Sequence, residues 1–114
     1  MKIYKGWRGP QGTIVTVDDV PLDPRTDLRN FNADGFEWGY EGSGPSQLAL
    51  ALIADHLNAE MALKHYRDFM TTIIAEIEGD EWTLTSEDID RRAEEIEIVP
   101  MDLETLLRKV RGEE

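Results

Sequence analysis

The sequence predicts an α+β fold, in which a small N-terminal antiparallel β-hairpin or meander packs on three to four α-helices. Two patterns predict it: β-branched and aromatic runs separated by turn residues fill residues 1–22, and helix-spaced apolar residues dominate from residue 45 onward. With 114 residues, 40% of them hydrophobic, the chain is long enough for one buried core. We therefore expect a single domain over residues 1–99 and a helical extension over 100–114.

The strands come first in the chain. Residues 2–7 mix aliphatic and aromatic side chains, and residues 13–17 are β-branched throughout. Residues 9–12 contain two glycines and a proline and predict the turn between them. Asp18-Asp19 predicts a second turn, after which residues 20–22 return as a short arm. Pro21 has no N–H group, so this arm belongs at an edge.

An irregular connection is expected over residues 23–35, which are rich in Asp, Asn, Pro and Gly, with Leu28 and Phe31 as apolar anchors. The next five residues alternate in polarity. An extended backbone would place Phe36, Trp38 and Tyr40 on one side.

The first helix is predicted to begin near Pro45, with Gly44 or Ser43 as the N-cap. It runs through Leu57, and its first three turns are apolar on nearly all sides, which indicates burial; Asn58 marks an end or a kink. A second, amphipathic helix is predicted over 59–79, ended by Gly79.

Residues 81–85 predict a short strand, and Thr85 with Asp88 resembles a capping box that opens a third helix. Pro100 breaks the chain, and Asp102 can cap a last helix. Its apolar side chains leave two options open, packing on the domain or forming a homodimer with a second copy of the chain: Leu103, Leu106, Leu107 and Val110.

The charge is strongly acidic and uneven. The net charge is −12, and residues 76–97, with ten acids and two bases, contribute −8 of it. Direct nucleic-acid binding is disfavoured, because phosphate contacts need clustered Lys and Arg. A protein partner with a basic surface is favoured instead.

Acidic side chains on the third helix are the predicted partner-binding residues: Glu87, Asp88, Asp90, Glu94, Glu95 and Glu97. A row of carboxylates can imitate a nucleic-acid backbone and occupy a basic groove. The alternative is a solvated helix face that keeps the protein soluble.

The glycine-rich loop before the first helix could bind a small ligand or an anion at the helix N-terminus. The residues concerned are Trp38, Tyr40, Gly42, Ser43, Gly44 and Gln47. The loop lacks the Lys of a phosphate loop, and Glu41 would repel phosphate. The alternative is that the loop only forms a tight entry into a buried helix.

No catalytic residue, metal site or cofactor is predicted. The chain has no cysteine, and nine residues separate His56 from His65, which places them on opposite sides of a continuous helix. No segment is apolar enough to cross a bilayer, and no signal peptide is evident, so a cytoplasmic protein is expected.

The motif F-x-W-G-Y-x-G-S-G-P-x-Q-L-A-L-A, read here from Phe36 to Ala51, resembles that of a family of short uncharacterised prokaryotic and phage proteins, a domain of unknown function. Ala62, Tyr66, Phe69, Trp82 and Leu84 fit the same resemblance, which covers roughly residues 1–90. It departs at Glu41 and Asp19, where glycine is expected. The resemblance implies no activity. Its phage and mobile-element setting favours a regulator or inhibitor of a host nucleic-acid-binding or defence protein.

Overall fold

The α+β fold is confirmed in the computed structural model, which describes residues 1–95; the side chains of Glu94 and Glu95 and all of residues 96–114 are outside this description. The four-stranded sheet has the order β3-β2-β1-β4. Its strands are β1 (Ile3–Gly9), β2 (Gly12–Val17), β3 (Val20–Pro21) and β4 (Glu81–Thr85). All its pairings are antiparallel.

The sheet is not purely N-terminal, because β4 arrives from the far end of the domain to pair with β1. The hairpin of β1 and β2 follows the predicted turn, with Gly9 opposite Gly12. Asp18 and Asp19 make the second turn with φ angles of 49° and 67°, the left-handed region that two-residue hairpin loops require. Within the sheet, Gly6 lies opposite Trp82, whose indole fills the space that a Cβ of residue 6 would need.

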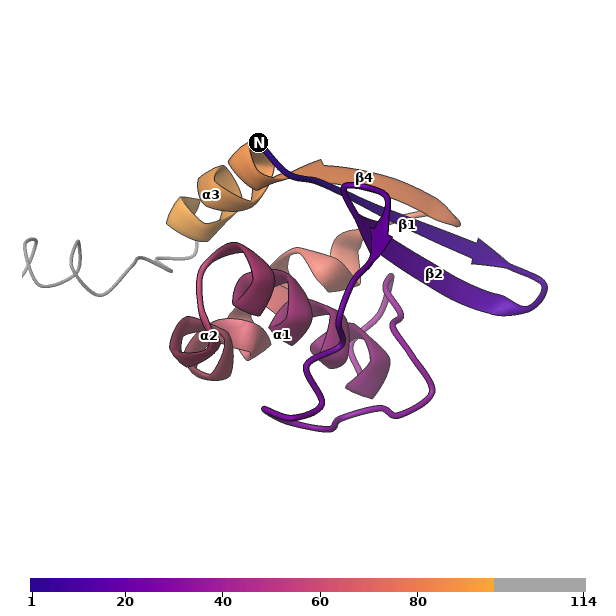
Figure 1. Ribbon diagram of the computed structural model, residues 1–114, viewed down its shortest axis with the longest axis horizontal. Coiled ribbons are helices and arrows are strands. Elements are labelled where there is room, and N and C mark those ends of the chain that lie inside the picture. The colour runs from indigo at the N-terminus through magenta and orange to yellow at the C-terminus, as the bar shows by residue number, and fades with distance from the viewer. Residues whose placement is uncertain (96–114) are drawn as a thin grey trace, which may run out of the picture.

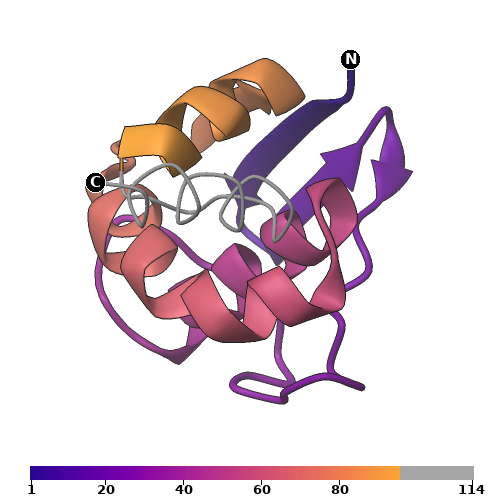
Figure 2. The same ribbon diagram turned by 90° about the vertical axis from the view of Figure 1, so that its left-hand side faces the viewer.

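Helices α1 (Ser43–His56) and α2 (Ala59–Thr72) lie on one face of the sheet, and none of the described elements covers the other, which we call the open face (Figure 1). Residues 44–54 of α1 are all buried, as the all-round apolar pattern predicts. The core joins α1 to Tyr4 and Val15 from the sheet, to Phe69 from α2 and to Ile74, which follows α2. The short α3 (Ser86–Glu95) follows β4 and begins beside the N-terminal residues (Figure 2).

The start of α1 differs from the expectation, whereas the chain does break at Asn58 as expected. The N-cap of α1 is Gly42 rather than Gly44 or Ser43, and the Ser46 N–H donates to the Gly42 carbonyl at 3.0 Å. Asn58 is an N-cap, since its side chain accepts a hydrogen bond from the Met61 N–H at 2.8 Å.

The predicted helix over 59–79 is too long. α2 ends at Thr72, and a 3₁₀ turn, η1 (Ile74–Glu76), follows it. The run Thr71–Ile74 is β-branched throughout and therefore a poor helix former. The Ile74 carbonyl also accepts a hydrogen bond from the Gly39 N–H at 3.0 Å, so tertiary contact takes over where the helix stops.

The capping box of α3 is confirmed. The Thr85 N–H donates to the Asp88 carboxylate at 3.0 Å, and the Asp88 N–H donates to the Thr85 hydroxyl at 3.1 Å. The predicted C-terminal helix and extension, with Leu103, Leu106, Leu107 and Val110, lie outside the described residues. In the described part of the chain, no helix combines the length and the apolar character needed to cross a membrane.

Candidate functional site

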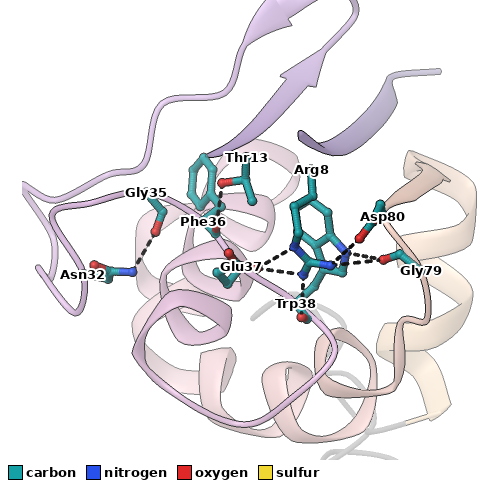
Figure 3. A network of polar contacts seen from close by, with 9 residues as sticks. All are labelled: Arg8, Thr13, Asn32, Gly35, Phe36, Glu37, Trp38, Gly79 and Asp80. Atoms are coloured by element: carbon teal, nitrogen blue, oxygen red, sulfur yellow. Dashed lines mark hydrogen bonds and ion pairs between the residues drawn. The ribbon is translucent and has the colours of Figure 1, made fainter. Parts of the chain in front are cut away.

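Arg8 joins the loop that enters α1 to the segment that enters β4 (Figure 3). Its Nε and Nη2 donate to Glu37 Oε1 at 3.2 and 2.7 Å, and its Nη1 donates to Asp80 Oδ1 at 2.9 Å. The guanidinium carbon lies 4.7 Å from the centre of the Trp38 ring, in cation–π geometry. Glu37 and then Asp80 raise the pKa of Arg8 further above its ordinary range. Arg8 therefore stays charged and links the two segments by ion pairs.

The Trp38-Gly39 dipeptide completes this junction. The Trp38 indole N–H donates to the Gly79 carbonyl at 3.0 Å, and the ring meets Trp82 edge-on with centroids 5.7 Å apart. Gly39 has a φ of 88°, and a Cβ there would lie 3.1 Å from the Ile77 carbonyl oxygen. A side chain at this position would be strained and crowded at once.

The turn at Gly39 corrects the expectation that Phe36, Trp38 and Tyr40 share one side. Trp38 is 1% exposed and Phe36 9%, whereas Tyr40 is 51% exposed. Because the chain bends at Gly39, the alternation of an extended strand does not continue through residue 40.

Gln47, one of the residues expected to bind a ligand, is fully buried and organises the chain instead. Its Oε1 accepts hydrogen bonds from the N–H groups of Phe31 and Asn32 at 2.8 and 3.2 Å. Its Nε2 donates to the carbonyls of Pro24 and Arg29 at 2.6 and 3.1 Å. The amide is fully occupied, and it explains how an irregular connection over 23–35 takes one conformation.

The other predicted ligand-binding residues do not converge. Gly44 is buried, and a Cβ there would lie 2.7 Å from Glu37 Cβ. Ser43 is exposed, and Gly42 is overlaid by the Tyr40 ring, 3.0 Å from where its Cβ would be. A hollow of about 400 Å³ lies elsewhere, at the hairpin tip, lined by Trp7, Pro10, Gln11, Gly12, Thr13 and Ile14. Of the two alternatives for this loop, its geometry therefore favours a tight connection into the buried helix and not a ligand-binding loop.

The predicted partner-binding residues on α3 are partly engaged within the protein. Asp88 belongs to the capping box and contacts Arg91, and Asp90 Oδ1 lies 2.5 Å from His56 Nε2. Glu87 is exposed with no described partner. Glu94 and Glu95 belong to the last turn of α3, with side chains outside the description, and Glu97 lies outside the described residues.

A second polar group ties the N-terminus to the end of α1. Asp55 Oδ2 accepts hydrogen bonds from the Tyr4 hydroxyl at 2.7 Å and from Lys2 Nζ at 3.0 Å. Burial, and then Asp55, raises the pKa of Tyr4. This group holds the domain together, and its side chains lie against one another rather than around a cavity. Among the described residues, no group of three or more His, Cys, Asp or Glu side chains could hold a metal ion.

The junction around Arg8 gathers acidic residues that lie far apart in the sequence. The segments 37–41 and 76–81 adjoin there, tied by the Gly39–Ile74 and Trp38–Gly79 hydrogen bonds. We call their carboxylates the acidic end: Glu37, Glu41, Glu76, Glu78, Asp80 and Glu81. Glu37 is half-buried against Arg8, while the other side chains are exposed.

The sequence shows that residues 76–97 carry much of the negative charge, but the partner-binding residues predicted from it lie on the third helix alone. It did not indicate that the segment with Glu37 and Glu41 lies next to residues 76–81. This proximity depends on the bend at Gly39 and on the ion pairs of Arg8. One signal was available for the outer face of the sheet. Along β1, Tyr4 and Gly6 face the core, so the alternation of the strand places Trp7 on the other face of the sheet, where it is 45% exposed.

Comparison with known proteins gives one relationship. No curated protein and no solved structure matches this chain. A family profile described as a family of unknown function (DUF6166) matches residues 4–95, most of the described fold. The chain therefore belongs to the family of unknown function DUF6166.

Proposed function

We propose that this protein is a non-enzymatic interaction module that binds a protein partner through a basic surface of that partner. The observation that carries the proposal is the acidic end, where two distant segments with six carboxylates between them meet, and where Arg8 pairs with two of these, Glu37 and Asp80. Arg8 is already paired with Glu37 and Asp80, so the exposed Glu41, Glu76, Glu78 and Glu81 are left for external cations.

The surroundings of the acidic end support binding rather than solubility alone. Tyr40 lies within it, 51% exposed, and tyrosine is enriched at interfaces because it supplies contact area at low entropic cost. Glu87, just after the other end of β4, is a further exposed acid. Such a surface complements proteins that themselves bind nucleic acid, because their grooves are lined by Lys and Arg. Regulation or inhibition of such a protein, in a phage or mobile-element setting, is the role that we propose.

The test is capture of partners from a native host lysate, with the immobilised full chain at about 0.05 and about 0.3 M NaCl. The variant Glu78→Lys/Glu81→Lys reverses two charges of the acidic end. The matched control Asp34→Lys/Asp68→Lys makes the same charge change at two other exposed acids.

We expect wild type and control to capture the same basic protein at low salt, and expect higher salt or the acidic-end variant to release it. Mass spectrometry identifies the captured protein and its charge. Retention by the acidic-end variant, salt-insensitive retention or the absence of any basic partner would overturn the proposal.

A further inference from the structure

Among the described strands, β4 is an edge of the sheet, the last strand in the order β3-β2-β1-β4. Two hydrogen bonds fix which of its backbone groups are already used. The Arg8 N–H donates to the Asp80 carbonyl at 2.8 Å, and the Ser86 N–H donates to the Lys2 carbonyl at 2.9 Å. In an antiparallel ladder, bonded pairs alternate with non-bonded ones, so Trp82 and Leu84 also bond to β1.

The intervening residues therefore point their backbone groups away from the sheet. The N–H and C=O groups of Glu81 and Thr83 face outward, and none of the described hydrogen bonds uses them. The Thr85 N–H, the next in this row, is taken by the Asp88 carboxylate. A row of unpaired backbone groups is a template for another strand.

β4 lacks the usual protection of an edge strand. It contains no proline and no lysine, and its register with β1 runs without a bulge from Glu81 to Thr85. The opposite edge is different, because the short β3 with its Pro21 covers part of β2.

The negative charges at both ends of β4 determine which kind of strand can pair with its edge. Glu78, Asp80 and Glu81 lie at its start, and Glu87 follows its end. Antiparallel pairing of β4 with the same strand of a second copy would bring the acidic start of each strand against Glu87 of the other. Like charges in such positions are destabilising, so self-pairing is disfavoured and a basic strand is favoured.

The open face of the sheet offers a further contact to such a strand. Glu81 is the direct cross-strand partner of Trp7, so both side chains project from this face. The Trp7 indole lies against Gly9, where it fills the space of the missing Cβ. An arginine on an added strand can pair with Glu81 and extend toward the indole, where guanidinium stacking is favourable.

We infer that the β4 edge accepts an extended basic segment of the partner as a fifth strand, by backbone pairing to Glu81 and Thr83. This inference rests on the proposed function and specifies how the partner is held. Backbone pairing supplies affinity in this mode, and the flanking carboxylates supply the preference for Lys and Arg.

The experiment uses a synthetic peptide of about nine residues that alternates Arg and Thr, a length within the range of natural strands. A second peptide has the same sequence and charge but N-methyl groups on alternate backbone amides, which block strand pairing. Binding to the full chain is followed by amide NMR shifts and hydrogen exchange at about 0.02 M NaCl.

We expect the plain peptide to shift and protect the Glu81 and Thr83 amides, and expect the N-methylated peptide to bind about tenfold more weakly. Thr83→Pro removes one outward N–H and should weaken the plain peptide, whereas Thr83→Val keeps the backbone and should not. Equal binding of the two peptides, shifts that map away from β4, no binding of either, or dimerisation through β4 would overturn the inference.

The peptide and lysate experiments separate the two proposals. If both peptides bind alike while capture still depends on Glu78 and Glu81, the edge inference fails and the proposed function stands. If capture shows no basic partner, the proposed function fails whatever the peptides do.

Discussion

At the scale of single residues, Gln47 shows how one buried amide can order a long loop. Its position in the motif before the Leu- and Ala-rich helix suggested a hydrogen-bonding role toward a ligand. The structure directs the same hydrogen-bonding capacity inward, to the backbone of residues 24–32. A connection that is rich in Pro, Asn and Asp has few apolar side chains with which to hold itself, so it depends on this amide.

Substitution of Gln47 tests this role. Gln47→Ala leaves two N–H groups and two carbonyls without their partner, and we expect it to lower the free energy of unfolding by about 3 kcal/mol. Gln11→Ala, at an exposed position of the hairpin turn, is the control and should change it by less than about 0.5 kcal/mol. Urea unfolding measures both. A loss at Gln47 no greater than at Gln11 would contradict the assignment.

At the scale of elements, α3 depends on its cap and on the contacts of its inner face. Its apolar stripe is thin, with Ile89 and Ala93 buried, so little burial holds it. The Thr85–Asp88 capping box and the contact of Asp90 with His56 add to the stability that this small buried surface gives the helix. The hydrogen bond from the Thr85 N–H, with Arg91 nearby, holds the pKa of Asp88 below its usual range.

The cap should therefore make stability depend on pH in the acidic range. A lowered folded-state pKa means that the charge-dependent stabilisation is present above the ordinary aspartate pKa, near pH 4, and is lost as the pH falls through the folded value. Asp88→Asn keeps an acceptor but removes the charge. We expect wild type to exceed this variant in stability at about pH 6 and the difference to shrink toward about pH 3.

Urea unfolding across this pH range checks the expectation, with Asp34→Asn as a control at an exposed carboxylate that accepts no described hydrogen bond. A difference that grows as the pH falls would show that the charge of Asp88 opposes folding.

At the scale of the whole molecule, a net charge of −12 on 114 residues makes self-repulsion a general cost of folding. Folding increases the cost at the acidic end, because it brings segments 37–41 and 76–81 together. Arg8 offsets part of this cost at the most crowded point, between Glu37 and Asp80.

Salt should relieve the repulsion. We expect the free energy of unfolding to rise by about 1 kcal/mol between about 0.01 and 0.1 M NaCl, as the screening length falls from about 30 to about 10 Å. The free energy of unfolding should depend less on salt in Glu78→Lys/Glu81→Lys than in Asp34→Lys/Asp68→Lys, because Glu78 and Glu81 belong to the acidic end. Thermal unfolding at several salt concentrations measures it. A fall in stability with salt would mean that the ion pairs outweigh the repulsion.

The sequence by itself determined the elements whose causes are local. Turn residues set the hairpin, all-round apolarity set the buried α1, and Thr85 with Asp88 set the start of α3. The helix over 59–79 was wrong at its end, because the β-branched run and the bond from Gly39 act together there.

The tertiary structure alone decided what depends on distant partners. It decided that β4 pairs with β1, that Tyr40 is exposed after Gly39, that Gln47 faces the loop, and that Glu37 and Asp80 meet at Arg8. The physical reason is the same in each case: side-chain spacing fixes which face a residue occupies within an element, but only contacts between elements fix what that face meets.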